Sequence, residues 1–212
     1  MQNLPKEEQD RQLVPKKLSP SKLAHIVLKT AQYEKMRAFY LEFLNARVAF
    51  ENGILSFLRY DDEHHRIVIA GLPGIAPKDA ASAGLDHFAF TFDTMGDLLS
   101  NYLRLKEAGI MPVWCINHGF TTSIYYADPD GNKIETQYDN MGVADADAFM
   151  QGEYYAKNPI GVDFDPEMLC ERYQRGDPLS ELVQQKVVRL SADAPHMPPP
   201  GLPPYDYRGE LI

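Results

Sequence analysis

The stretch "LAHIVLKTAQYEKMRAFYLEFLNA", residues 23–46, recurs in altered form as "LDHFAFTFDTMGDLLSNYLRLKEAG", residues 85–109. Each copy begins with Leu-x-His and continues as a short β-type run. The apolar residues then recur every three to four positions, which is typical of an amphipathic helix. Similarity at a fixed spacing is the signature of a repeated structural unit. The chain is therefore predicted to contain two copies of one small module.

Three strand-like runs follow each predicted helix. They are "VAFEN", "ILSFLRY" and "RIVIAG" in the first copy, and "PVWCI", "TSIYYAD" and "NKIETQ" in the second. The expected fold class is α+β, with paired βαβββ modules at residues 22–72 and 84–140 that form one domain over 22–140. An open sheet leaves a face and its edges uncovered, so we expect the two sheets to pair around a shared cavity.

The segments on either side of this domain have a different composition. Residues 1–21 are polar and interrupted by proline, which predicts a flexible N-terminal arm. Residues 141–212 are predicted to be a helical and then Pro-rich extension. The Asp-Pro pairs at 165–166 and 177–178 each indicate a helix start. Six prolines between residues 195 and 204 indicate extended chain, for which we consider a role in wrapping a partner subunit.

Composition excludes several classes of function. A net charge of -9 argues against nucleic acid or an anionic membrane as a partner. No apolar run approaches the ~18 residues of a membrane span, and the N-terminus has no hydrophobic core typical of a secretory signal. The two cysteines, Cys115 and Cys170, lie in unrelated contexts and predict no disulfide framework. We expect a cytoplasmic protein.

When the two modules are aligned, two pairs of equivalent positions are relevant to a site. His25 lies opposite His87, and Val68 lies opposite Glu135. A single strand histidine is more often a core residue bonded to a carbonyl, and Glu135 alone would be an outward-facing strand residue. Two equivalent histidines and one carboxylate instead make a three-point ligand set with open positions, which suits non-haem Fe(II). Val68 supplies no fourth ligand and leaves room for substrate and dioxygen.

With this pattern and the stretch "IYYADPDGNKIE", residues 124–135, the chain from about residue 22 to 175 resembles the vicinal oxygen chelate superfamily. That superfamily includes glyoxalases, fosfomycin-resistance proteins and extradiol dioxygenases. The chain is most similar to the small single-domain extradiol dioxygenases of the biphenyl-2,3-diol or catechol 2,3-dioxygenase type. The resemblance implies His25, His87 and Glu135 as ligands of Fe(II), with Mn(II) as the alternative metal. It also implies an oxidoreductase that adds both atoms of O2 to a catechol-like aromatic diol.

Further residues are assigned by the same resemblance. The stretch "YDDEHHRIVIAG", residues 60–71, implies His65 as the acid–base group, a task that suits imidazole. The stretch "NHGFTTSIYY" implies His118 as a second active-site histidine and Tyr125 as a hydrogen-bond donor to the substrate oxygen. The spacing from His118 to Tyr125 is shorter than in two-domain dioxygenases. A solvated turn is the alternative for His65 and the preferred interpretation of His64, and an exposed loop is the alternative for His118.

Other functions remain open on the sequence alone. They are a glyoxalase-like or fosfomycin-resistance-like isomerase or transferase, an oxygenase acting on a non-catechol compound, and a non-catalytic small-molecule-binding member. The missing fourth ligand disfavours a glyoxalase, and His65 disfavours fosfomycin resistance. A binding protein would have no need of the complete ligand set. A homo-oligomer, a dimer or larger, is expected.

Overall fold

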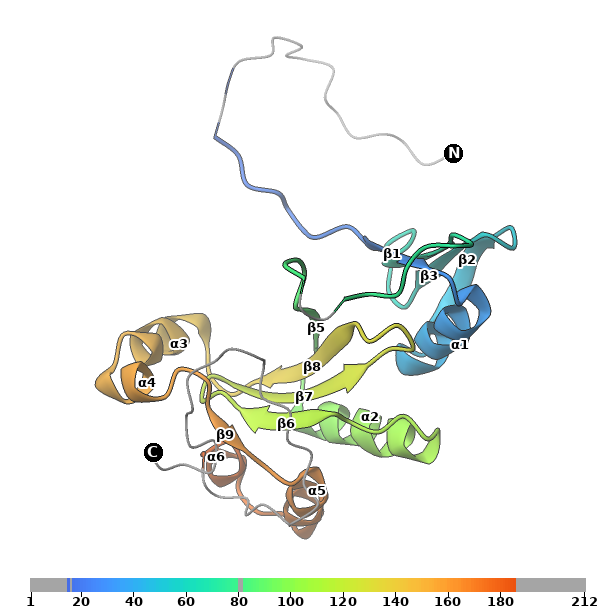
Figure 1. Ribbon diagram of the computed structural model, residues 1–212. Helices are drawn as coiled ribbons and strands as arrows, with labels where there is room; N and C mark the ends of the chain where they lie inside the picture. The colour runs from blue at the N-terminus through green and yellow to red at the C-terminus, as the bar shows by residue number, and fades with distance from the viewer. Residues whose placement is uncertain (1–14, 16, 80–81, 186–212) are drawn as a thin grey trace.

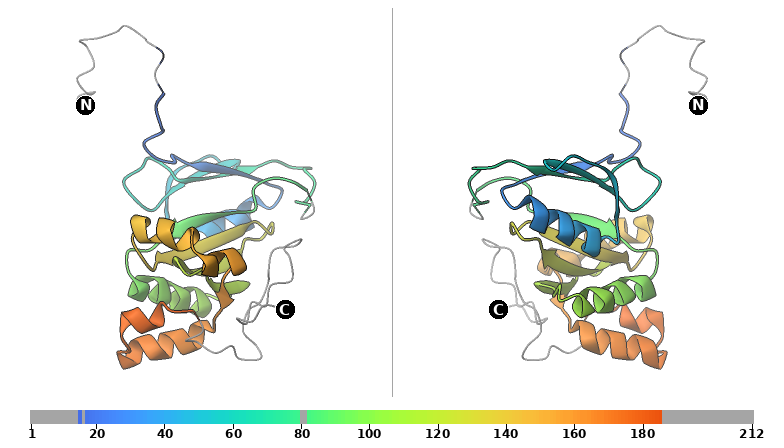
Figure 2. Two further views of the ribbon diagram at one scale, coloured as in Figure 1. Left: turned by 90° about the vertical axis from the view of Figure 1, so that its left-hand side faces the viewer. Right: turned by 90° about the vertical axis from the view of Figure 1, so that its right-hand side faces the viewer.

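The computed structural model describes residues 15, 17–79 and 82–185. The predicted Pro-rich tail and most of the predicted N-terminal arm lie outside these residues. Within the described part the strands form two sheets, one of four strands and one of five. The sheets belong to different modules and lie in separate layers (Figure 1, Figure 2). In these same residues no helix is both long and apolar enough to cross a membrane.

The first module has the predicted order of elements. They are β1 (Ile26–Thr30), α1 (Tyr33–Phe43), β2 (Arg47–Glu51), β3 (Leu55–Arg59) and β4 (Ile67–Gly71). The strand order is β1-β4-β3-β2, with β1 and β4 parallel and the other pairs antiparallel. The crossover from β1 to β4 through α1 gives the sheet one face covered by a helix.

The second module repeats this order. Its elements are β5 (His87–Thr91), α2 (Met95–Glu107), β6 (Trp114–Asn117), β7 (Thr121–Ala127) and β8 (Lys133–Asp139). The strand order is β5-β8-β7-β6-β9, again with the first and last strands of the module parallel. The short strand β9 (Val162–Asp163) comes from the C-terminal extension and pairs with β6. The expected α+β fold of paired βαβββ modules is confirmed.

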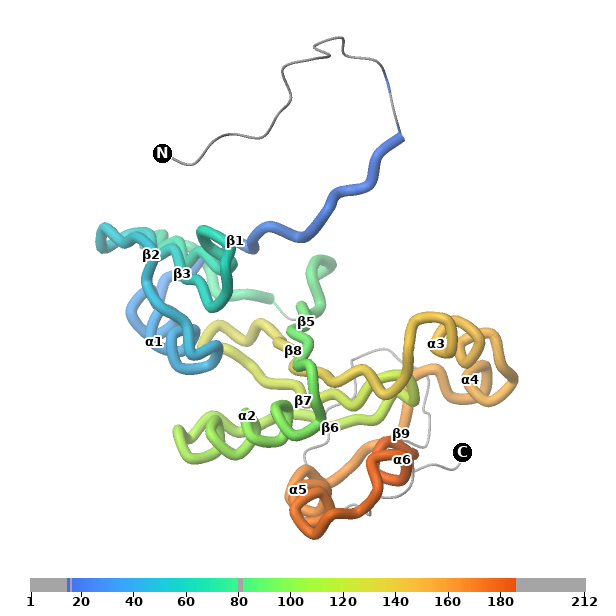
Figure 3. Tube along the Cα trace, turned by 180° about the vertical axis from the view of Figure 1, so that it is seen from behind, coloured from blue at the N-terminus to red at the C-terminus, as the bar shows by residue number. Residues whose placement is uncertain are grey.

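The extension contributes four helices to the described residues. They are α3 (Val143–Met150), α4 (Glu153–Lys157), α5 (Pro166–Arg175) and α6 (Leu179–Leu182). Helix α5 begins as predicted, because the Asp165 side chain accepts a hydrogen bond from the Glu167 amide. Helix α6 differs, because its N-cap is Pro178 and the Asp177 carboxylate instead pairs with Arg172 and Arg175. Figure 3 shows α3 and α4 beyond one end of the second sheet, away from α5 and α6.

The two modules share one apolar core, formed by α1, α2 and one face of each sheet. The Tyr40 hydroxyl donates to Asp128 over 2.8 Å, and the Phe43 ring meets the Tyr126 ring with centroids 5.2 Å apart. Arg104 on α2 donates to the carbonyl oxygen of Phe43, at the end of α1. Because strand residues alternate between faces, the opposite face of each sheet points away from this core.

Candidate metal centre

The structure places the six predicted site residues in two separate groups. One group lies on the second sheet and consists of His87, His118, Tyr125 and Glu135. The other lies at one end of the first sheet and consists of His25 and His65. Both groups are on the sheet faces that point away from the shared core.

His87 and Glu135 form the centre of the larger group. They stand on neighbouring parallel strands, β5 and β8, and their Nε2 and Oε2 atoms are 3.2 Å apart. Glu135 is only 5% exposed, so it does not face water as alternation alone would suggest. The other ring nitrogen of His87, Nδ1, lies 2.7 Å from the Asp86 carboxylate, which also pairs with Lys133. Asp86 therefore holds the hydrogen on Nδ1 and directs Nε2 toward Glu135.

Electrostatics support an ion pair between these two residues. The hydrogen bond to Glu135 raises the pKa of His87, although burial opposes this, and Asp86 adds to the increase. Burial alone would raise the pKa of Glu135, but hydrogen bonds from His87 and Ser123 outweigh it and leave that pKa below its ordinary value. A histidine whose second nitrogen is held by a carboxylate, next to an ionised glutamate, is the usual arrangement of metal ligands.

His118 and Tyr125 extend this group. His118 Nδ1 is hydrogen-bonded to the carbonyl oxygen of Ile160, and its Nε2 lies 3.1 Å from the Tyr125 hydroxyl. A carbonyl only accepts, so the hydrogen of His118 is on Nδ1. Burial lowers the pKa of His118, so the ring is neutral and Nε2 accepts from Tyr125. Burial and then the nearby charge of Glu135 raise the pKa of Tyr125, which keeps its hydroxyl protonated.

A turn in the C-terminal extension fixes His118. The Asn158 side chain accepts from the amides of Ile160 and Gly161 and closes this turn. Gly161 has φ +118°, and a Cβ there would lie 2.3 Å from the Asn117 carbonyl oxygen. Only glycine therefore lets the turn approach the β6–β7 loop closely enough to present the Ile160 carbonyl to His118.

Aromatic side chains pack against the Tyr125 ring. The ring centroids of Trp114 and Tyr125 are 5.0 Å apart, and those of His87 and Tyr125 are 5.2 Å apart. The Trp114 indole donates to Asp163 on β9 over 2.9 Å. The second sheet thus presents an apolar, aromatic wall beside the His87–Glu135 pair, suited to a flat ring.

The smaller group has no acidic member. His25 is exposed and directly precedes β1, and its ring centroid lies 4.4 Å from that of His65. His65 also contacts the Phe57 ring at 4.8 Å, which places it over the face of the first sheet. Burial and the neighbouring His25 and His64 lower the pKa of His65. His64 is exposed, in keeping with its interpretation as a solvated turn residue.

The described residues do not contain three or more His, Cys, Asp or Glu side chains placed to hold a metal ion. His25 is therefore not brought to His87 and Glu135. A non-haem Fe(II) site of the expected type needs two histidines and one carboxylate. One chain, as described, supplies two of these ligands at one place and does not by itself fit the metal.

Two parts of the site were not predicted from the sequence. Asp86 immediately precedes His87, whereas Ala24 precedes His25. That difference between the two Leu-x-His motifs was a usable signal for a carboxylate behind the predicted metal ligand. The contact of His118 with Ile160 gave no such signal, because it uses a backbone carbonyl from a segment 42 residues away.

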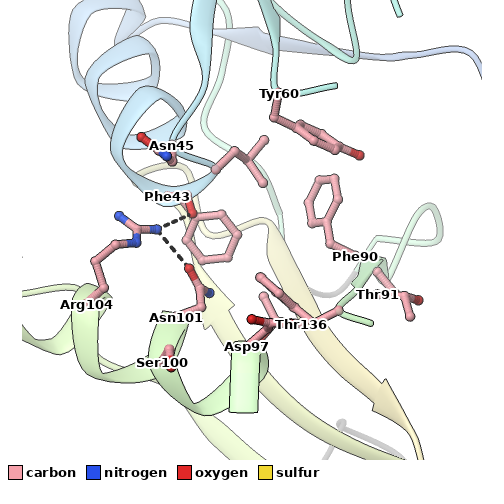
Figure 4. A pocket seen from close by; sticks show the side chains of 13 residues that line it. Phe43, Asn45, Tyr60, Phe90, Thr91, Asp97, Ser100, Asn101, Arg104 and Thr136 are labelled. Atoms are coloured by element: carbon pink, nitrogen blue, oxygen red, sulfur yellow. Dashed lines mark hydrogen bonds between the residues drawn. The ribbon is translucent and has the colours of Figure 1, made fainter. Parts of the chain in front are cut away.

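A cavity of about 560 Å³ lies elsewhere, between the end of α1, strand β5 and helix α2. Its walls include Phe43, Tyr60 and Phe90, with Asn101 and Arg104 on the side of α2 (Figure 4). None of the six predicted site residues lines it. Arg104 is already engaged with α1, so the polar side of this cavity serves the contact between the modules.

Comparison with known proteins agrees with this architecture. Residues 22–136 match the family model of the glyoxalase/bleomycin resistance protein/dioxygenase superfamily. The chain belongs to this superfamily. It is 45% identical over 163 residues to biphenyl-2,3-diol 1,2-dioxygenase 2 of Rhodococcus globerulus, which covers 76% of this chain and 86% of the relative. Biphenyl-2,3-diol 1,2-dioxygenase 3 of the same organism is 45% identical over 164 residues, with the same shares of the two chains.

Solved structures of the superfamily are more distant. A glyoxalase/dioxygenase from Nostoc punctiforme is 22% identical and covers 59% of this chain and 98% of its own, with a TM-score of 0.48. A lactoylglutathione lyase from Agrobacterium tumefaciens is 20% identical and covers 56% of this chain and 94% of its own, with a TM-score of 0.46. The predicted superfamily, and within it the likeness to biphenyl-2,3-diol dioxygenases, are confirmed by the family model and the two curated relatives.

Proposed function

We propose that this protein is a non-haem Fe(II)-dependent extradiol-type dioxygenase that cleaves the ring of a catechol-like aromatic diol with O2. The observation that carries the proposal is the His87–Glu135 pair, 3.2 Å apart and backed by Asp86. The identity of 45% to two enzymes named biphenyl-2,3-diol 1,2-dioxygenases supports the reaction class. The substrate class in this proposal is a catechol-like aromatic diol.

The metal ligands in this proposal are His25, His87 and Glu135. Where these three residues meet on one ion, Fe(II) would supply the open coordination positions and the redox chemistry that dioxygen requires. Val68, on the face of the first sheet, is apolar and 4% exposed, which agrees with the absence of a fourth protein ligand. Mn(II) remains the alternative metal.

The remaining residues bind the diol and move its protons. The Tyr125 ring lies beside that of His87, and its protonated hydroxyl would exchange its bond to His118 for one to a substrate oxygen. His118, held by Ile160, orients that hydroxyl. His65 adjoins the third ligand, His25, and an imidazole there is suited to take a phenolic proton and return it later.

We further propose a reducing, cytoplasmic compartment for this protein. Cys115 and Cys170 are both free and buried, so the fold uses no disulfide between them. Thiols in such a state are typical of reducing environments.

The decisive test is reconstitution of the protein with Fe(II) without oxygen, followed by a panel of catechols in air. We expect a yellow ring-fission product and one O2 consumed per diol, with a matched Zn(II)-loaded sample showing neither. A parallel Mn(II) sample decides between the two metals. Stoichiometric iron binding without oxygen uptake on any diol would contradict the proposed reaction.

A further inference from the structure

We propose that the cavity between the end of α1, strand β5 and helix α2 binds a small, flat, neutral aromatic compound that carries a carbonyl oxygen. This cavity is separate from the candidate metal centre, because none of the six predicted site residues lines it. The inference therefore goes beyond the proposed function and does not depend on it.

The cavity has the size and the place of a ligand site. Its volume of about 560 Å³ falls within the range of roughly 300–1,000 Å³ that is usual for small-molecule pockets. Phe43 and Tyr60 of the first module and residues of β5 and α2 in the second form its walls. Junctions between packed units are preferred places for small molecules. A compound bound here would contact both modules at once.

The side chain of Asn101 is the strongest indication of a ligand. Asn101 lies on α2, lines the cavity and is only 9% exposed. Its Oδ1 accepts a hydrogen bond from Arg104 over 2.9 Å, which fixes the orientation of the amide. The amide nitrogen Nδ2 is buried and has no acceptor among the described residues. Figure 4 shows this nitrogen on the side of the amide toward Thr136, away from Arg104.

A buried donor without an acceptor is unfavourable, because it has lost its hydrogen bond to water and gained none in return. Thr136, which also lines the cavity, donates its own hydroxyl hydrogen to the Ile124 carbonyl oxygen over 3.1 Å. The Asn101 amide therefore requires an acceptor from a bound molecule. A carbonyl oxygen fits best, because it accepts only, whereas a hydroxyl would bring a hydrogen that needs an acceptor of its own.

Aromatic rings form much of the remaining lining. Phe43 is buried, Phe90 is partly buried and Tyr60 is exposed at the rim. The Tyr60 ring meets the Phe90 ring edge to face, with centroids 5.7 Å apart and planes at 86°. Aromatic rings prefer edge-to-face and offset stacked partners, so a flat ring is the body that this lining accepts best.

The charges in the lining favour a neutral compound. Arg104 and Asp97 are the charged residues that line the cavity. Arg104 is already paired with Glu42 over 2.6 Å. The Asp97 carboxylate accepts from the Thr94 hydroxyl, which is a neutral partner. An anionic compound would be repelled by Asp97, and a cationic group would give the free amide donor no acceptor.

The location of the site is tested by photolabelling of the full-length protein with benzophenone. Benzophenone is a neutral diaryl ketone that links covalently to nearby C–H bonds under near-ultraviolet light. Peptide mapping by mass spectrometry is expected to find the label on α2, on β5 or on the segment around Tyr60. Label confined to the segments of the candidate metal centre, or scattered over the surface, would overturn the inference.

The need for a carbonyl oxygen is tested by competition. Excess methyl benzoate, a neutral aromatic ester, is expected to suppress the labelling of these segments. Isopropylbenzene, a hydrocarbon of similar shape without an acceptor, is expected to suppress it at least about 10-fold less well, the effect of one buried hydrogen bond. Equal suppression by the two compounds would overturn the role of the Asn101 donor, and suppression by neither would mean that the cavity is no ligand site.

Asn101→Asp tests the donor directly. The new carboxylate keeps an oxygen for Arg104 but replaces the amide nitrogen with a second oxygen, which cannot donate to a carbonyl. We expect calorimetry to show methyl benzoate bound at least about 10-fold more weakly. Asn52→Asp is the matched control, because Asn52 is exposed and its oxygen accepts from the amides of Ile54 and Leu55 in either form.

Circular dichroism establishes that both variants are folded. Unchanged affinity for methyl benzoate in folded Asn101→Asp would contradict the proposal, as would an equal loss in Asn52→Asp. If Asn101→Asp does not fold, the two competitors on the wild-type protein decide the question. Ring cleavage is measured separately by oxygen uptake. Its absence would overturn the proposed function and leave the inference about this cavity intact.

Discussion

The ring centroids of His65 and His25 are 4.4 Å apart, whereas on the other sheet His87 Nε2 lies 3.2 Å from Glu135 Oε2. The predicted acid–base residue therefore lies beside one of the predicted metal ligands and apart from the other two. The predicted roles in metal binding and proton transfer therefore fall on neighbouring but different side chains. Substitutions can separate the two roles.

Replacing His65 with alanine is expected to leave the metal bound and to remove turnover. General acid–base groups contribute on the order of 10²- to 10⁴-fold to rate, and a loss of that size is expected in kcat. Iron content by atomic emission and steady-state oxygen uptake are the two measurements. Asp62→Ala is the control, since Asp62 is an exposed residue of the same loop, and it should keep the parental rate. Parental turnover in His65→Ala would remove its assigned role.

Replacing Glu135 with alanine is expected to cost metal occupancy itself. The carboxylate is buried, and its negative charge lies directly against His87 Nε2. Equilibrium dialysis against Fe(II) without oxygen measures the loss. Gln137→Ala is the matched control, two residues along the same strand and on the same face. Full iron retention in Glu135→Ala would exclude the carboxylate as a ligand.

Replacing Asp86 with asparagine is expected to weaken metal binding by about 10- to 100-fold, the usual effect of losing a carboxylate behind a ligating histidine. The change keeps the shape of the side chain but removes the charge that holds His87 Nδ1–H. Co(II) titration gives the affinity. Lys133→Met is the control, because it removes the Lys133–Asp86 salt bridge but leaves the Asp86–His87 contact and the pairing of residues 87 and 133 in the sheet. A larger loss in Lys133→Met than in Asp86→Asn would contradict this role.

The modules themselves were predictable from the sequence, because each is built from contacts between neighbouring segments. The repeated Leu-x-His motif marked both first strands, and the alignment of Val68 with Glu135 followed the fourth strands correctly into equivalent sheet positions. The arrangement of one module against the other was not predictable. It depends on contacts such as Tyr40 with Asp128, which join residues 88 positions apart and leave no periodic signal.

The same dependence on contacts between distant residues explains which parts of the site could be predicted. Residues on adjacent strands of one module, such as His87 and Glu135, were expected together and are together. His25 was expected with them, but its distance from them depends on how the modules pack and on how many chains assemble. A single sequence indicates which residues share one face of a sheet and how neighbouring strands align. It indicates much less about which two sheet faces pack against each other.

Arg104 joins the modules, and its replacement by methionine is expected to destabilise the fold by about 2 kcal/mol, as expected for charge-assisted hydrogen bonds. It donates to the carbonyl oxygens of Glu42 and Phe43 and to Asn101. Urea unfolding followed by fluorescence measures the change. Arg175→Met is the control, because among the described residues the Arg175 guanidinium donates to Asp177 in the α5–α6 turn and not across the modules. Equal effects of the two variants would show that Arg104 has no special part in joining the modules.

Replacing Gly161 with alanine is expected to lower turnover without removing the metal. The added Cβ would meet the Asn117 carbonyl oxygen at 2.3 Å, so the turn must retreat and withdraw the Ile160 carbonyl from His118. His118 then loses its fixed orientation toward Tyr125. Gly131→Ala is the control. It introduces the same backbone strain, because Gly131 also has a positive φ, but no steric clash, because nothing lies within 4 Å of its Cβ position. Oxygen uptake should fall in Gly161→Ala alone, while Co(II) titration should show an unchanged metal affinity. Equal rates of oxygen uptake in the two variants would mean that the turn does not position His118.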